Sequence, residues 1–148
     1  MEIRAYTDRD REAVRTMYDL AKQDEMRGSV DLDAVLPLSD DPTHLALFRD
    51  STILIAFEGK DILGFAGYKG SYISWLYVHP AHRRRGVATT LLSATLQHLP
   101  RPVTLDVGKN NNAARALYEQ VGFVVENEFT RKFYGHDVEV LTLRYSRQ

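Results

Sequence analysis

The chain has 148 residues, of which 44% are hydrophobic, and a formal net charge of −1 at pH 7. This length and composition predict one domain, residues 1–148, with a single continuous core, and the near-zero charge disfavours a general attraction to nucleic acid or to an anionic membrane. Because cysteine is absent, disulfides, thiolate metal sites and cysteine nucleophiles are excluded.

The N-terminal third is predicted to combine one strand with two helices. Residues 2–6 have the pattern of a short strand, and Thr7 is a candidate N-cap for a helix that ends near Gly28. That helix carries an apolar stripe at helical spacing, made by Val14, Met17, Tyr18 and Ala21. Residues 19–41 hold seven acidic residues against two basic ones, and their Pro, Gly and Ser predict a helix, a loop and a second short helix.

Residues 52–78 are rich in β-branched and aromatic residues and are divided by two glycine turns, which predicts three neighbouring antiparallel strands. The apolar runs here, such as TILIAF, are far shorter than the roughly 20 residues that span a bilayer. The first residues contain no signal-peptide core. We therefore expect a cytoplasmic protein with no membrane partner.

The second half predicts a β–α–β unit followed by a helix and a hairpin. A helical face runs from Ala88 to Leu99 and is closed by a proline, and a strand follows at residues 102–107. A second helix is expected over residues 111–121, before a hairpin over residues 123–145. The fold class is therefore α+β, with a mixed, mostly antiparallel sheet of six to seven strands and helices on both faces.

The segment His82 to Leu92, HRRRGVATTLL, places three arginines and a glycine in the short connection between a predicted strand and the N-terminus of a predicted helix. The first turn of a helix has free N–H groups and a partial positive charge, so it holds phosphate readily. Gly86 and Ala88 are expected to leave room for phosphate, Thr89 to add a hydroxyl donor, and Arg83, Arg84 and Arg85 to supply charge-assisted bonds. Solvated surface, a targeting signal and a nucleic-acid patch are the alternatives, but stacking aromatics do not surround the run. A pyrophosphate site is favoured.

This arrangement resembles the GNAT family of acetyl-CoA-dependent N-acetyltransferases, whose signature is Gln or Arg, two residues, Gly, one residue, then Gly or Ala. Residues 83–88, Arg-Arg-Arg-Gly-Val-Ala, match it, and the preceding LYVHP looks like the exit of the family's fourth strand. Residues 110–123, NNNAARALYEQVGF, are similar to a second family segment, Asn-x-x-Ala-x-x-Leu-Tyr-Glu-x-x-Gly-Phe. The order of predicted elements along the whole chain also fits the family.

The resemblance implies acetyl-CoA as cosubstrate. It places the pyrophosphate on residues 83–89, including Val87, and the pantetheine arm on main-chain groups of Leu76, Tyr77 and Val78. The N–H of Val78 is the expected donor to the oxyanion that forms on the thioester carbonyl. Asn111 is expected to bind the pantetheine amides or to position a water, although simple helix capping is the alternative.

The resemblance also implies catalytic roles. Tyr118 matches the family's proton donor to the leaving thiolate, with packing against the sheet as the alternative. Asp106, five residues before Asn111, is the candidate base that accepts the proton of the amine, with His79 or a water as alternatives. The five histidines show no metal-binding spacing, so no metal is expected.

The expected acceptor is a primary amine of a small molecule, peptide or protein, and the acidic residues between 19 and 41 favour a cationic one. A non-catalytic acyl-CoA-binding sensor or interaction module of the same fold is the alternative function. An RNA-binding protein is a third, and nucleic acid is not an expected partner. Family members often dimerise, and residues 139–145 can pair at a sheet edge, so a homodimer is compatible with the sequence.

Overall fold

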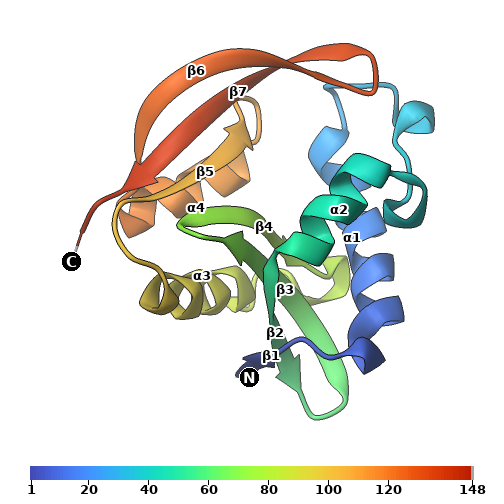
Figure 1. Ribbon diagram of the computed structural model, residues 1–148, viewed down its shortest axis with the longest axis vertical. Helices are drawn as coiled ribbons and strands as arrows, with labels where there is room; N and C mark the ends of the chain where they lie inside the picture. The colour runs from blue at the N-terminus through green and yellow to red at the C-terminus, as the bar shows by residue number, and fades with distance from the viewer. Residues whose placement is uncertain (148) are drawn as a thin grey trace.

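The structure is a computed structural model that describes residues 1–147, and it is built on one sheet (Figure 1). Its strands are β1 (Glu2–Ala5), β2 (Thr52–Glu58), β3 (Asp61–Lys69), β4 (Tyr72–Val78), β5 (Val103–Gly108), β6 (Val124–Phe133) and β7 (His136–Tyr145). Its α-helices are α1 (Arg11–Met26), α2 (Pro42–Asp50), α3 (Val87–His98) and α4 (Asn112–Val121). The element order therefore agrees with the expectation from the sequence.

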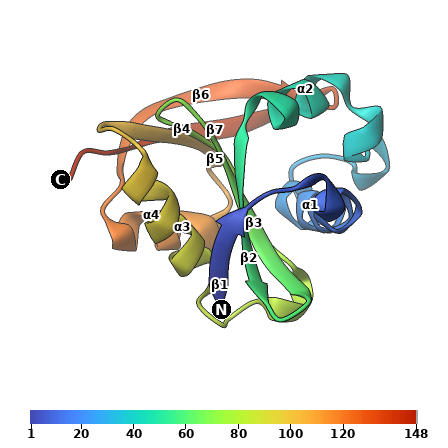
Figure 2. The ribbon, with the colours of Figure 1, turned by 60° about the horizontal axis from the view of Figure 1, so that its bottom comes forward.

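The strands lie in the order β1-β2-β3-β4-β5-β7-β6. Every neighbouring pair is antiparallel except β4 and β5, which are parallel and joined through α3. Helices α1 and α2 lie on one side of the sheet, and α3 and α4 lie on the other (Figure 2). The predicted α+β class, with a mostly antiparallel mixed sheet and helices on both faces, is confirmed.

The N-terminal third differs from the prediction in one place. The stretch after α1 forms two short 3₁₀ turns, Leu32–Ala34 and Leu38–Asp40, and the second α-helix begins only at Pro42. Asp41 caps that helix by accepting a hydrogen bond from the N–H of His44, and proline fits the first helical position because it needs no partner for an N–H. The acidic stretch thus precedes α2 and does not contain it.

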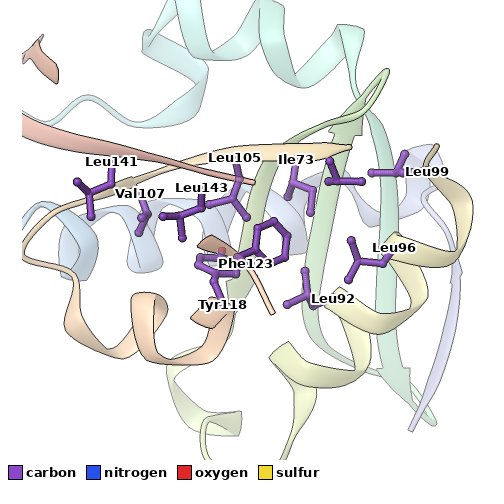
Figure 3. Close-up of a cluster of buried hydrophobic side chains, with 11 residues drawn as sticks. Ile73, Leu92, Leu96, Leu99, Leu105, Val107, Tyr118, Phe123, Leu141 and Leu143 are labelled. Carbon is purple, nitrogen blue, oxygen red and sulfur yellow. The ribbon is translucent and has the colours of Figure 1, made fainter. Parts of the chain in front are cut away.

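Each face of the sheet has its own core. On the α1–α2 face, Tyr18, Ile55 and Phe65 are fully buried with apolar residues of both helices. On the other face, leucines of α3 and α4's Tyr118 pack with Phe123 against β5 and β7 (Figure 3). The predicted apolar faces of α1 and α3 are the ones that become buried, which is what stabilises the layered arrangement.

Candidate active site

A groove opens where β4 and β5 separate. The two strands pair only at Tyr72 with Thr104 and at Ile73 with Leu105. The β3–β4 register then slips between Gly67 and Tyr68, which leaves Ser74 as an extra residue on β4. A bulge of this kind bends and twists its strand, so the rest of β4 diverges from β5. The resulting groove has a volume of about 690 Å³ and is lined from both faces of the sheet.

The main chain of β4 supplies hydrogen-bonding groups to this groove. The N–H of His79 donates to the carbonyl of Leu63 at 2.8 Å, which marks this pair as hydrogen-bonded across β3 and β4. Because such pairs alternate along an antiparallel ladder, Tyr77 also bonds β3, whereas Leu76 and Val78 direct their N–H and C=O groups toward the groove. The main chain of Tyr77 is therefore not available there, although its side chain lines the groove.

The N-terminus of α3 forms an open cradle beside β4. Gly86 has φ +78°, a left-handed conformation that suits glycine, and nothing lies within 4 Å of the place where a Cβ would stand. The first intrahelical bond runs from the N–H of Thr90 to the carbonyl of Gly86, so the preceding N–H groups of the first turn have no helical acceptor. Val87, Ala88 and Thr89 all line the groove, and Val87 is also buried in the core.

The three consecutive arginines point in different directions. Arg83 lines the groove and pairs with Asp24 of α1 at 2.7 Å. Arg84 also lines the groove, and within residues 1–147 its side chain has no ion-pair partner. Arg85 instead pairs with Glu58 at 3.0 Å and is not part of the groove wall. Two of the three predicted phosphate ligands are thus placed for an anion in the groove.

Tyr118 and Asn111 reach the groove from α4. Tyr118 is only 8% exposed and packs against Phe123 at a ring distance of 5.6 Å (Figure 3). Burial, followed by the charge of Glu25, raises the pKa of its hydroxyl well above the usual value, so the proton is retained at neutral pH. Asn111 caps α4 by accepting a hydrogen bond from the N–H of Ala114, and it also lines the groove.

Asp106 lies in the groove wall with both carboxylate oxygens occupied. Oδ1 accepts from the Thr142 hydroxyl at 2.7 Å, and Oδ2 accepts from the Tyr72 hydroxyl at 3.3 Å and from Arg131 at 3.2 Å. These three donors hold the carboxylate in the groove wall. Burial and the charge of Asp106 raise the pKa of Tyr72 to about 12.

The side chain of His79, the alternative base, caps the turn that follows it in the chain. Its Nδ1 accepts a hydrogen bond from the N–H of Ala81 at 3.0 Å, and its ring lies beside His82 with a centroid distance of 5.5 Å. It is absent from the set of described residues that line the groove. Among the described residues, His79 thus lies outside the groove wall that contains Tyr118 and Val78.

The α1–α2 side of the groove contains polar groups that sequence reasoning missed. Lys22 is 4% exposed, and its Nζ donates to Glu25 at 2.9 Å and lies 5.6 Å from the centre of the Phe133 ring. The other oxygen of Glu25 accepts from the Tyr77 hydroxyl at 2.9 Å. His44 of α2 also lines this side. We call Lys22, Glu25, His44 and Phe133 the α1–α2 side, and Arg83, Arg84, residues 86–89, Asn111 and Tyr118 the α3–α4 side.

These groups were missed because they come from segments far apart in the sequence. The one local signal is the run Asp41-Pro42, which marks a helix start and places His44 in its first turn. Several of the acidic residues between 19 and 41 are also engaged within the fold. Asp24 pairs with Arg83, Glu25 pairs with Lys22, and Asp19 accepts from the N–H of Leu38 at 2.9 Å. This weakens the sequence argument for a cationic acceptor.

Two further properties bear on partners. Within residues 1–147, no three His, Asp or Glu side chains converge as they do around a bound metal ion. In the same range, none of the helices combines the length and the apolar character that crossing a membrane requires.

Sequence comparison links the chain to acetyltransferases. Residues 11–123 match the model of the Acetyltransferase (GNAT) family. The chain is 36% identical over 113 residues to a mycothiol acetyltransferase of Saccharomonospora viridis, covering 74% of this chain and 36% of that protein. It is 35% identical over 91 residues to the human cysteine-rich protein 2-binding protein, covering 61% of this chain and 11% of that protein. The chain thus spans well under half the length of these two relatives.

Structural comparison gives the same fold. A GCN5-related N-acetyltransferase of Rhodopseudomonas palustris superimposes with a TM-score of 0.84 at 24% identity, covering 99% of this chain and 95% of that one. An acetyltransferase of Salmonella typhimurium, whose structure contains acetyl-CoA, gives 0.74 at 19% identity, covering 99% and 93%. The divided sheet, the glycine cradle and the family match over residues 11–123 lead to one conclusion: the chain belongs to the GNAT acetyltransferase family.

Proposed function

We propose that this chain is an acetyl-CoA-dependent N-acetyltransferase that acts on a primary amine, with residues 1–148 as one catalytic domain. The observation that carries the proposal is a single groove that joins the Gly86 cradle, the free main-chain groups of β4 and the buried Tyr118 hydroxyl. Acetyl-CoA is the cosubstrate that supplies the acetyl thioester. A cytoplasmic location is part of the same proposal.

The α3–α4 side fits the cofactor. The open space above Gly86 and the free N–H groups of the first turn of α3 suit a pyrophosphate, because backbone donors and the helix dipole both favour an anion there. Arg83 and Arg84 are placed to add charge-assisted bonds, whereas Arg85 is engaged elsewhere. The groove-facing groups of Leu76 and Val78 suit the amides of the pantetheine arm.

The chemistry requires a stabilised oxyanion and a proton for the leaving thiolate. The N–H of Val78 is the proposed oxyanion donor, fixed by the β3–β4 ladder before the reaction begins. Tyr118 is the proposed proton donor, because its raised pKa keeps the hydroxyl protonated and it borders the same groove. Asp106 is assigned to holding Tyr72 and Arg131 in the wall, because its carboxylate accepts a hydrogen bond from each of these side chains.

The test is turnover with a panel of amines: spermidine, tyramine, and tetrapeptides with an N-terminal alanine or an internal lysine. Acetyl-CoA is supplied at saturation, and free thiol is recorded together with the mass of the acceptor product. We expect acetylation of at least one member. Binding of acetyl-CoA with no acetyl transfer to any amine would instead favour the acyl-CoA-binding sensor.

A further inference from the structure

The α1–α2 side carries a histidine–carboxylate pair that faces the acetyl-binding groove. We propose that His44 is the general base that takes the proton from the acceptor amine and that Asp41 is the positioning residue that orients it. His44 Nδ1 lies 2.7 Å from Asp41 Oδ2, and the His44 ring lines the groove that also contains Tyr118 and the groove-facing main chain of Val78. The inference rests on the proposed acetyltransferase function.

The contacts of Asp41 determine which ring nitrogen of His44 carries the proton. Asp41 is 6% exposed, and its Oδ2 also accepts from the Tyr134 hydroxyl at 2.9 Å while Oδ1 accepts from the N–H of His44 at 3.3 Å. Burial acts to raise the pKa of Asp41, but these hydrogen bonds and the His44 charge together lower it, so Asp41 is ionised. A carboxylate only accepts, so Nδ1 of His44 is the donor and Nε2 keeps its lone pair.

The His44 ring is held in place and leaves that lone pair free. Its plane lies nearly parallel to the Tyr134 ring, at 22° and a centroid distance of 6.4 Å, and its side chain is 21% exposed. Within residues 1–147, Nε2 makes no hydrogen bond. A fixed imidazole that lines a groove, with one nitrogen bonded to a carboxylate and the other without a partner, is the arrangement that enzymes use for proton abstraction.

The surroundings of His44 favour its neutral form at physiological pH. Burial is the main effect that lowers its pKa, and the charge of Lys22 acts in the same direction, against Asp41 and Glu25, which raise it. Tyr134 faces the ring from the β6–β7 turn. At the unperturbed value of about 6.5, roughly three quarters of a histidine population is already neutral at pH 7, and lowering the pKa increases that share.

The other candidate bases have no comparable free acceptor. Both oxygens of Asp106 receive hydrogen bonds, and both oxygens of Glu25 do as well, from Lys22 and from the Tyr77 hydroxyl. His79 uses Nδ1 as a cap and stands outside the groove wall among the described residues. Of these candidates, His44 alone combines a groove position with a basic atom that makes no hydrogen bond within residues 1–147.

The proton balance of the step is complete. The amine nitrogen forms a bond to the acetyl carbon and the carbon–sulfur bond breaks, while the amine proton passes to Nε2 of His44. Tyr118 gives its proton to the sulfur. His44 then releases a proton to solvent and Tyr118 recovers one from solvent, so both residues return to their starting states.

The test uses His44→Asn, because the asparagine amide stands near Nδ1 and can still donate to Asp41, while the titratable Nε2 is removed. The acceptor is the amine of the panel above that the parent acetylates fastest. We expect kcat/KM for this amine to fall by about 10²–10³-fold at pH 7.5, the usual size of general-base catalysis, with acetyl-CoA affinity within about threefold. A fall in acetyl-CoA affinity instead would overturn the assignment.

The pH dependence separates a base from a structural residue. The ratio of parent to variant kcat/KM cancels the ionisation of the acceptor itself. We expect this ratio to be constant above neutrality and to fall as the pH drops below about 6.5, because the parent then protonates His44 and loses its base. A ratio near one, or a large ratio that does not change between pH 5 and 8, overturns the proposal.

Two controls keep the test decisive. If His44→Asn is unfolded, His44→Ala with added imidazole replaces it: restoration of turnover by imidazole supports a base, and no restoration overturns it. Asp41→Asn should reduce turnover and flatten the same pH dependence, because an amide at Oδ2 no longer fixes the tautomer. A parent that binds acetyl-CoA but acetylates no amine counts against the proposed function, whereas an active parent matched by an equally active His44 variant counts only against this inference.

Discussion

The two sides of the groove are built from different kinds of groups. The α3–α4 side offers main-chain N–H groups from the first turn of α3, and the open space above Gly86 gives access to them. The α1–α2 side offers side chains of Lys22, Glu25, His44 and Phe133, brought together from two helices and the C-terminal hairpin. Main-chain groups change little when residues are substituted, whereas side chains do. We infer that binding of the shared cosubstrate depends on the first side and that selection of the acceptor depends on the second.

The largest expected effect comes from Gly86→Asp on the α3–α4 side. The new carboxylate enters the open space above the cradle and repels phosphate, so acetyl-CoA binding should be lost. In the parent, acetyl-CoA at about 100 times its Kd should stabilise the fold by about 2.7 kcal/mol and raise Tm by on the order of 5–10 °C. The variant should show no shift.

Gly70→Asp is the matched control. Gly70 has φ +59°, also with nothing within 4 Å of its missing Cβ, but it lies in the β3–β4 turn outside the groove wall. It carries the same left-handed strain and the same new charge, so its Tm should fall while the acetyl-CoA shift remains. A normal shift in folded Gly86→Asp would place the phosphate elsewhere.

The next largest effect is a loss of turnover without a loss of acetyl-CoA binding. Tyr118→Phe keeps the ring against Phe123 and removes only the hydroxyl, so kcat should fall by roughly 10²–10⁴-fold while acetyl-CoA affinity changes by a few-fold at most. Tyr145→Phe is the control, because Tyr145 also packs on Phe123, at 5.2 Å, yet does not line the groove. Equal turnover in Tyr118→Phe and the parent, with chemistry limiting, would reduce Tyr118 to a packing residue.

A smaller effect separates neighbouring arginines. Arg84→Ala should weaken acetyl-CoA binding by about 10- to 100-fold, the value of one charge-assisted hydrogen bond, because this side chain lines the groove without a protein partner in residues 1–147. Arg85→Ala should change affinity by less than about threefold, since that side chain pairs with Glu58 at the surface. Titration calorimetry of the two variants measures both affinities for acetyl-CoA. Equal losses of affinity would contradict the different directions of the two side chains.

The same contrast explains what the sequence could predict. Hydrophobic periodicity and turn residues were enough for the α+β class, and the contiguous motif from Arg83 to Ala88 located the cradle because its parts are neighbours in the chain. The hydrogen bond between Tyr134 and Asp41 could not be predicted in this way, because it joins, at 2.9 Å, two residues that are 93 positions apart in the sequence.

The bulge at Ser74 shows a second limit. Simple alternation along β4 places Ile73 and Trp75 on the same face of the sheet, yet Ile73 packs with α3 and α4 while Trp75 packs with α1 and α2. No residue in ISWLYV marks that change, since it depends on how β4 pairs with β3. Asp106 is similar: its position at a strand was predictable, but the donors that occupy it come from the hairpin.

The smallest effect concerns the ion pair that joins the two sides. Asp24 of α1 holds Arg83 at 2.7 Å, and the bond from Arg83 lowers the pKa of Asp24, so the pair is charged at neutral pH. Because both side chains are about 40% exposed, the pair is worth at most about 1 kcal/mol.

Asp24→Asn frees Arg83 for phosphate, and we expect acetyl-CoA affinity to rise by up to about fivefold at low salt, with the gain shrinking as salt screens both interactions. Asp50→Asn, which removes the exposed partner of Lys69 away from the groove, should leave the affinity unchanged. If the gain from Asp24→Asn persists in an Arg83→Ala background, then Asp24 acts by general repulsion and not through the pair. Weaker binding in Asp24→Asn would mean that the carboxylate holds Arg83 in its binding position, and that the two sides are coupled in the opposite sense.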